Sequence, residues 1–316
     1  MIRLLAVGAI WTSAMVGAIN AQPHDSAFEV QLEATDKTTQ FPGGVIIFPA
    51  SDSKNDTEVG HINLATGEHN TRFPLVTKNI HQWDYKPTRW GMYDVKLTCA
   101  ASGDNQPVIE VEVAGHSFVT VPKSIEGTNR FKTIPIGRFY LEKSEPFIAK
   151  VQYYGGARIG SFLIKSLTLR PAPEGGPIVQ AENGAFSLPA SNAITHSVLM
   201  RYEPAAIKNC MGYWMNPADW AEWIFDVKKP GTFEIEVWQG CGKGSGGSDV
   251  FVEAGGKQFP FVVEDTGHFQ NFVPRRVGQV TFDKPGEQSL QIHVKRQQKG
   301  AIMDIREVKL LPVEKN

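Results

Sequence analysis

Two stretches of the sequence decide the fold: Gly231-Thr-Phe-Glu-Ile-Glu-Val237 and Gly91-Met-Tyr-Asp-Val-Lys-Leu97. Each begins with glycine and then alternates apolar and polar side chains, which is the period of a β-strand with one buried face. The two stretches are 140 residues apart (231 − 91). They therefore predict strands, and they indicate that the chain repeats itself.

The repeat continues on both sides of these stretches. At shifts of 140 or 141 residues, 48–51 matches 188–191, Trp83 matches Trp223, 109–113 matches 250–254, and 167–171 matches 308–312. Such a period is too long for a solenoid unit and has the size of a whole domain. We expect two copies of one domain, at 22–172 and 178–316, joined by the linker Pro171-Ala-Pro-Glu-Gly-Gly-Pro177.

Each copy consists of short alternating segments separated by turn signals. In the second copy, Lys229-Pro-Gly231 and Lys284-Pro-Gly286 interrupt seven such segments, and no long helical pattern is present. The sequence therefore predicts an all-β chain of two tandem antiparallel β-sandwiches. With only three cysteines, packed cores must supply most of the stability.

The N-terminus reads as a secretory signal peptide at 1–21, with Arg3, a short apolar run and the small residues of Ala18-Ile-Asn-Ala21. The alternative, a membrane anchor, needs a longer uninterrupted apolar run. We expect a secreted or periplasmic protein without membrane insertion. The 32 basic and 33 acidic residues nearly balance, so the composition does not favour nucleic acid as a partner.

Three polar and aromatic segments of the second copy should converge, because alternate loops of successive hairpins gather at one end of a sandwich. The predicted ligand-binding residues there are Tyr213, Trp214, Asn216, Asp219, Trp220, His268, Gln270 and Asn271, with Glu264 and Asp265 beside them. Aromatic rings together with amide and carboxylate groups suit a sugar. For Trp214 and Trp220 packing and ligand contact both remain open, whereas Trp223 is expected in the core.

The same geometry brings the glycine-rich loop 240–248 to that end. It contains Gly242-Lys-Gly-Ser-Gly-Gly247, but a strand instead of a helix follows, so a dinucleotide site is disfavoured. We interpret the loop as a tight turn at the rim of the ligand site. Its Cys241 should lie near Cys210, which predicts a disulfide between them, and Cys99 is expected to be a buried thiol.

The second copy resembles a known sequence family through Gly212-Tyr-Trp-Met-Asn-Pro-Ala-Asp-Trp220, Gln239-Gly-Cys-Gly-Lys-Gly244, 263–272 and Met303-Asp-Ile305. It looks like the galactose-binding-like, jelly-roll β-sandwich appended to planctomycete-type exported sulfatases. It is also distantly similar to carbohydrate-binding modules of families 6 and 35. The first resemblance implies a non-catalytic module. The second implies a structural calcium held by Glu182 and Asp304; in the first copy Leu163 replaces the aspartate.

Three classes of function follow from these observations. The first is an exported carbohydrate-binding protein associated with glycan degradation. Its glycan class is open: Arg275-Arg276 raises the hypothesis of an anionic ligand, although solvated strand charges explain this pair better. The second is a structural or assembly protein that binds another exported protein. The third, disfavoured because no nucleophile or zinc motif is present, is a glycan-active enzyme using Asp219 with Glu264 or Asp265.

Overall fold

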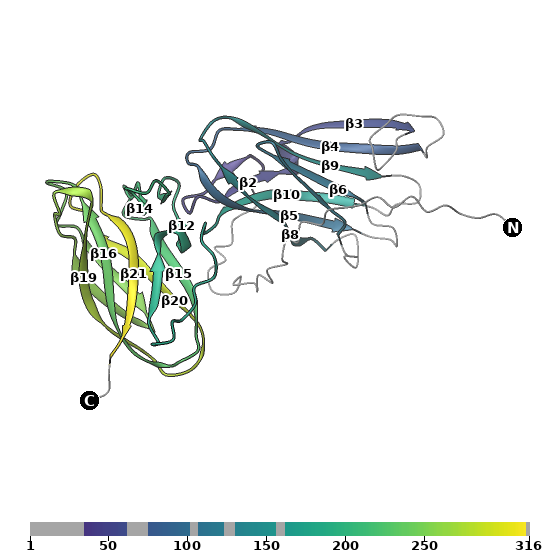
Figure 1. Cartoon of the computed structure of the whole chain (residues 1–316). Helices are drawn as coiled ribbons and strands as arrows, with labels where there is room; N and C mark the ends of the chain where they lie inside the picture. The colour runs from purple at the N-terminus through teal and green to yellow at the C-terminus, as the bar shows by residue number, and fades with distance from the viewer. Residues whose placement is uncertain (1–34, 62–74, 102–106, 123–129, 156–161, 314–316) are drawn as a thin grey trace. The chain divides into compact units, whose positions relative to one another are not determined.

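The computed structural model describes residues 35–61, 75–101, 107–122, 130–155 and 162–313 (Figure 1). The described residues are almost entirely strands, with two single-turn 3-10 helices at Ala50–Asp52 and Ala190–Asn192. None of their helices is long and apolar enough to cross a membrane. The predicted all-β, antiparallel sandwich class is confirmed. The leader expected at 1–21 lies outside the described residues.

The first sandwich consists of two five-stranded antiparallel sheets. One has the order β1-β2-β10-β5-β8: β1 (Thr39–Gln40), β2 (Ile46–Pro49), β10 (Phe162–Pro171), β5 (Gly91–Ala101) and β8 (Lys132–Leu141). The other has the order β3-β4-β9-β6-β7: β3 (Lys54–His61), β4 (Leu75–Tyr85), β9 (Phe147–Gly155), β6 (Ile109–Val113) and β7 (His116–Thr120).

The second sandwich has the same plan. One sheet has the order β13-β14-β21-β16-β19, with β11 also paired to β21: β13 (Arg201–Glu203), β14 (Cys210–Gly212), β21 (Asp304–Pro312), β16 (Gly231–Cys241), β19 (His268–Phe282) and β11 (Phe186–Pro189). The other has the order β12-β15-β20-β17-β18: β12 (Ile194–His196), β15 (Trp220–Val227), β20 (Gly286–Arg296), β17 (Asp249–Ala254) and β18 (Lys257–Val262).

Each sandwich encloses its own core, built by the alternation seen in the sequence. In β5 alternate residues from Gly91 to Cys99 are buried, and in β17 the buried positions are Val250, Val252 and Ala254. The largest core side chains repeat as well. Trp83 Nε1 donates to the Pro49 carbonyl at 3.0 Å, and Trp223 Nε1 donates to the Pro189 carbonyl at 2.8 Å. The two copies therefore share most of their strand order and the hydrogen bond of their central tryptophan; they differ at one sheet edge, where the first has β1 and the second has β13 and β14.

The turns repeat with small changes. The hairpin β17–β18 turns at Gly255 and Gly256, both with positive φ (56° and 72°), and the hairpin β6–β7 turns at Ala114 and Gly115 (51° and 82°). Two positive φ values are what a two-residue hairpin turn requires. Ala114 therefore adopts a conformation that glycine adopts at the matching position of the other copy.

Candidate functional site

The loop tryptophan predicted as a sugar platform is a core residue. Trp214 is 1% exposed, and Asp219 is 3% exposed with Ser197 Oγ donating to its Oδ2 at 2.6 Å. Asn216 is exposed, and its Oδ1 accepts the Ala218 amide at 3.0 Å. Tyr213 is exposed, but the Arg201 guanidinium lies 3.5 Å from its ring centroid. These residues do not form an open aromatic platform.

The segment 264–271 binds the glycine loop instead of presenting free groups. Asp265 accepts the amides of Gly244 and Gly267, and these bonds lower the pKa of its carboxyl. Asn271 Nδ2 donates to the Thr266 carbonyl at 2.7 Å, and Gln270 Nε2 donates to Asp304 Oδ2 at 3.4 Å. His268 is exposed. The polar groups of this segment therefore hold the loop 240–248 in place.

The predicted disulfide between Cys210 and Cys241 is wrong for this structure. Cys210 lies on β14 and Cys241 on β16, and β21 runs between these two strands. Two strand spacings amount to about 9–10 Å, which is beyond the Cα separation of a disulfide. Each Sγ points to a different partner, Asp304 Oδ2 at 3.6 Å for Cys210 and the Ile302 carbonyl at 3.7 Å for Cys241. Both are buried free thiols, as is Cys99.

The predicted calcium ligands are not brought together. Strand β11 runs antiparallel to β21, with Phe186 opposite Leu310, so Glu182 lies near the end of β21. Asp304 begins β21, and the strand separates the two carboxylates by about 25 Å. Glu182 is exposed, and its carbonyl accepts Lys229 Nζ at 2.7 Å. Asp304 lies instead with Glu203 and Cys210.

The two arginines considered for an anionic ligand are both paired with carboxylates. Arg275 forms an ion pair with Glu264, and Arg276 lies 3.4 Å from Glu234 and 3.6 Å from Glu236. Their positive charge is therefore largely compensated within the protein.

Trp220 is the one predicted tryptophan that lies on an outer face. In β15 the side chains of Ala221, Trp223 and Phe225 lie in the core. Trp220 alternates with them and therefore points to the other face of the sheet. There it stacks on His196 of β12, with ring centroids 3.5 Å apart and planes 6° apart. On its other side lies His293 of β20, at 5.0 Å and 20°. Phe251 of β17 continues the stack from His293, at 5.2 Å and 18°.

We call this set (His196, Trp220, His293 and Phe251) the aromatic row. It runs across the strands because strand register aligns its members: His196 faces Trp220, and Phe251 faces His293. All four side chains are half-buried. The inner rings have both faces covered by their neighbours, so the row presents ring edges to solvent as a narrow apolar ridge over four strands.

A second, polar row lies beside the aromatic row, two residues further along each strand. Glu222 faces Gln291, Gln291 faces Glu253, and Glu253 faces Gln258. Glu222 Oε1 accepts Gln291 Nε2 at 3.1 Å, and Glu253 Oε2 accepts Gln258 Nε2 at 2.9 Å. We call these four residues the polar row. Glu222 and Gln291 are buried, Glu253 is half-buried and Gln258 is exposed, so the row offers a carboxylate and an amide at its β17–β18 end.

The polar row also fixes the two imidazoles. His196 Nε2 lies 3.4 Å from Glu222 Oε2, and His293 Nε2 lies 2.9 Å from Gln291 Oε1. A proton on Nε2 of each ring satisfies both contacts. Burial lowers the pKa of His293, while Glu253 and Glu222 oppose this shift and His196 adds to it. The histidines are therefore oriented for stacking, and His293 is held in its neutral form.

Sequence reasoning found only Trp220 of this row. His196, His293 and Phe251 were available as outward positions of alternating strands, but they are separated by up to 97 residues (293 − 196). Only the register of β12, β15, β20 and β17 brings them into contact.

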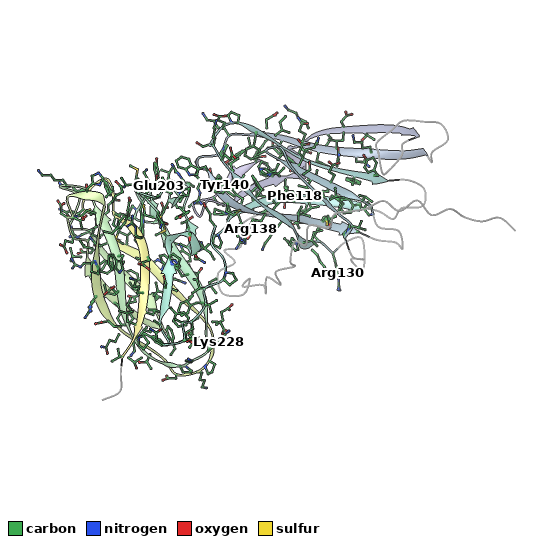
Figure 2. All side chains as sticks on the ribbon, in the orientation of Figure 1. Phe118, Arg130, Arg138, Tyr140, Glu203 and Lys228 are labelled. Atoms are coloured by element: carbon green, nitrogen blue, oxygen red, sulfur yellow. The ribbon has the colours of Figure 1, made fainter. Side chains whose placement is uncertain are left out.

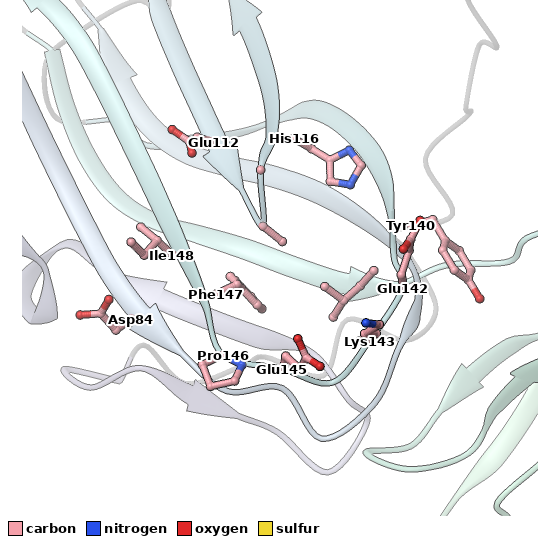
Figure 3. Close-up of a pocket in the computed structure, with 13 residues that line it drawn as sticks. Asp84, Glu112, His116, Tyr140, Glu142, Lys143, Glu145, Pro146, Phe147 and Ile148 are labelled. Atoms are coloured by element: carbon pink, nitrogen blue, oxygen red, sulfur yellow. The ribbon is translucent and has the colours of Figure 1, made fainter.

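The first sandwich has a pocket of about 670 Å³ near the β6–β7 and β8–β9 turns (Figure 3). Its lining includes the carboxylates of Asp84, Glu112, Glu142 and Glu145. Lys54 is ion-paired with Asp84, and Lys150 lies 2.6 Å from Glu112. The lining combines these carboxylates with Lys143 and with apolar side chains such as Leu141, Phe147 and Ile148.

Comparisons with known proteins give similarities of fold only. No family model and no curated protein matches the chain. Among solved structures it is similar to the C-terminal family 6 carbohydrate-binding module of the laminarinase LamC from Zobellia galactanivorans, with 15% identity, 40% of this chain and 98% of that chain covered, and a TM-score of 0.33. It is similar to a family 35 carbohydrate-binding module from Clostridium thermocellum, with 14% identity, 40% and 96% covered, and a TM-score of 0.26.

A family 35 module of Abf62 from Cellvibrio japonicus has 15% identity, covers 40% of this chain and 91% of that chain, and has a TM-score of 0.27. Identities and TM-scores of this size do not transfer a ligand, so the function of this chain rests on its own residues.

Proposed function

We propose that this chain is an exported, non-catalytic glycan-binding protein whose contact surface is the aromatic row and the polar row of the second sandwich. The observation that carries the proposal is the stack of four rings from four strands on the outer face of a sheet. A soluble sandwich usually places polar side chains there, whereas apolar ridges next to hydrogen-bonding groups are a feature of ligand sites.

The stack determines how a sugar would bind. Because His196 and His293 cover both faces of Trp220, a pyranose cannot stack on that indole face to face. It would instead pack its apolar C–H groups across the ring edges, and its hydroxyls would reach the polar row. Several ring edges in line suit an extended chain of sugars lying across the strands.

The charges support a neutral glycan. Glu222 and Glu253 both belong to the polar row, and no described lysine or arginine is ion-paired with either of them. Sulfated or uronic-acid chains would face like charge here, and Arg275 and Arg276 are already paired with carboxylates.

The expected affinity is modest. Ring edges bury less apolar area than an open ring face, and association itself costs several kcal/mol. Weak binding at a single site is therefore expected, so dense display of the glycan is needed for detection.

The test is a densely printed glycan array probed with residues 22–316, followed by titration of the best neutral oligosaccharide. We expect Phe251→Ala to weaken binding at least tenfold, because it removes the ring at one end of the row without removing a side-chain hydrogen bond. The matched control is Glu110→Ala, at the corresponding position of the first sandwich, which should bind normally. An array without any bound neutral glycan, or equal binding by Phe251→Ala, would contradict the proposal.

A further inference from the structure

A second cluster of side chains lies in the other sheet of the second sandwich. Glu203 ends β13, Cys210 begins β14 and Asp304 begins β21; Glu203 is labelled in Figure 2. Glu203 and Cys210 face each other across the β13–β14 pair. One ligand atom from each residue, two carboxylate oxygens and one sulfur, lies within 4.8 Å of the others. Glu203 and Asp304 are each 7% exposed, and Cys210 is fully buried.

Two carboxylate oxygens of the cluster lack a donor. Lys208 binds Glu203 through Oε1, and Cys210 and Gln270 bind Asp304 through Oδ2. Among the residues that the structure describes, Glu203 Oε2 and Asp304 Oδ1 accept no hydrogen bond. These two oxygens could therefore bind a cation without losing a hydrogen bond from the described residues.

Both of these oxygens converge on Gly212. A Cβ at this position would clash with Glu203 Oε2 and would lie 3.4 Å from Asp304 Oδ1. The absence of a side chain at Gly212 thus leaves the space in which the two oxygens approach each other. Lys208 forms an ion pair with Glu203, and its charge also acts on Asp304 and Cys210; among the described residues none forms an ion pair with Asp304.

We propose that Glu203, Cys210 and Asp304 bind a thiophilic divalent cation of the Zn²⁺ type. A thiolate with two carboxylates suits zinc, whereas calcium prefers six to eight oxygen ligands. Around one zinc ion, ligand atoms lie about 3–4 Å from one another, so the observed spacing requires only small side-chain rotations. This site differs from the calcium pair expected from the sequence, since it shares Asp304 but replaces Glu182 by a thiol and another carboxylate.

Binding would displace the Cys210 proton. The S–H bond breaks, the sulfur keeps the electron pair and donates it to the cation, and the proton leaves to solvent. The affinity of this cluster for the cation should therefore increase with pH. No redox step is involved.

The test uses the full mature chain after treatment with a chelator. Titration with Cd²⁺ should produce the ultraviolet charge-transfer band of a cadmium–thiolate bond, and titration with Zn²⁺ should raise the Tm. Cys210→Ala should abolish the band and weaken Zn²⁺ binding at least about 100-fold. Cys99→Ala, which removes a buried thiol of the first sandwich, is the matched control and should retain both signals.

A second variant keeps the test decisive if Cys210→Ala folds poorly. The Lys208 side chain is 38% exposed and forms an ion pair with Glu203, so it would compete with the cation for this carboxylate. Lys208→Met should therefore tighten Zn²⁺ binding several-fold. Absence of the cadmium band in the unaltered chain, equal Zn²⁺ binding by Cys210→Ala, or weaker binding by Lys208→Met would each overturn the proposal. Glycan binding is measured separately, so either proposal can fail without the other.

Discussion

The same sheet face carries different side chains in the two sandwiches. In the second sandwich the row reads His196, Trp220, His293 and Phe251 across four strands. In the first, strand register places Asp56, Ile80, Gln152 and Glu110 in the same order. The correspondence is fixed by the core, since Ile80 precedes Trp83 by three residues as Trp220 precedes Trp223.

This difference shows which positions of the fold are constrained by packing. Inward positions keep their character in both copies because a close-packed core tolerates little change in volume. Outward positions lie outside the core in both copies and can differ without altering the fold. A ligand site can therefore be present on one copy and absent from the other, although the two copies share most of their strand order.

The largest expected effect tests the shared part of the comparison. Trp83→Ala and Trp223→Ala should each lower the free energy of unfolding of their own sandwich by about 3–5 kcal/mol. Both side chains are buried, and both donate to a proline carbonyl. Denaturant unfolding followed by far-ultraviolet circular dichroism measures the effect. A large loss of unfolding free energy in one copy and a negligible loss in the other would show that the two tryptophans do not have equivalent roles in their cores.

A smaller loss of stability is expected at Gly240 of β16, a position at which the two copies carry different residues. Gly240 occupies the position of Ala100 in the first copy (a shift of 140), and a Cβ there would clash with the Phe269 carbonyl. Gly240→Ala should cost about 1–3 kcal/mol through overpacking. Gly176→Ala, in the linker, has nothing within 4 Å of its added Cβ and should be nearly neutral. Equal Tm values for the two variants would show that the 264–271 segment does not pack firmly on β16.

The smallest expected effect concerns pH and the aromatic row. Burial lowers the pKa of His293 below its ordinary value of 6.5, so the unfolded chain takes up a proton on this residue before the folded chain does. The stability that depends on the neutral ring is complete above pH 6.5 and is lost as the pH falls through the pKa of the folded state.

The variant His293→Gln, which copies Gln152 of the first sandwich, should remove this component. The measurement is the difference in free energy of unfolding between the unaltered chain and the variant at pH 8 and at pH 5. We expect the difference to shrink or reverse at pH 5. A difference that is the same at both values would show that His293 does not titrate abnormally.

Much of the fold could be predicted from the sequence because its information is local. The alternation in 91–97 and 231–237 follows from one buried sheet face, and the glycine and proline turns follow from backbone geometry. The position of Trp223 in the core followed from its recurrence as Trp83. These features depend on neighbouring residues or on direct comparison of one stretch with another.

The candidate sites depended on which strands pair. Trp214 was predicted near a ligand but is buried, and Trp220 stacks on rings from two other strands. The disulfide prediction is wrong because β21 lies between the strands that carry Cys210 and Cys241. The order of loops along the chain did not reveal that β21 pairs with both of these strands. The same strand brings Asp304 to Cys210 and away from Glu182.

The sequence by itself thus determined the all-β class, the internal repeat and the core positions within the alternating strands, since these follow from periodicity and from comparison of one stretch with another. Only the tertiary structure decided that four rings form one row and that two carboxylates and a thiol share one buried cluster. Both arrangements arise from strand register between segments far apart in the chain, and a change of one residue in that register would turn each side chain to the opposite face of the sheet.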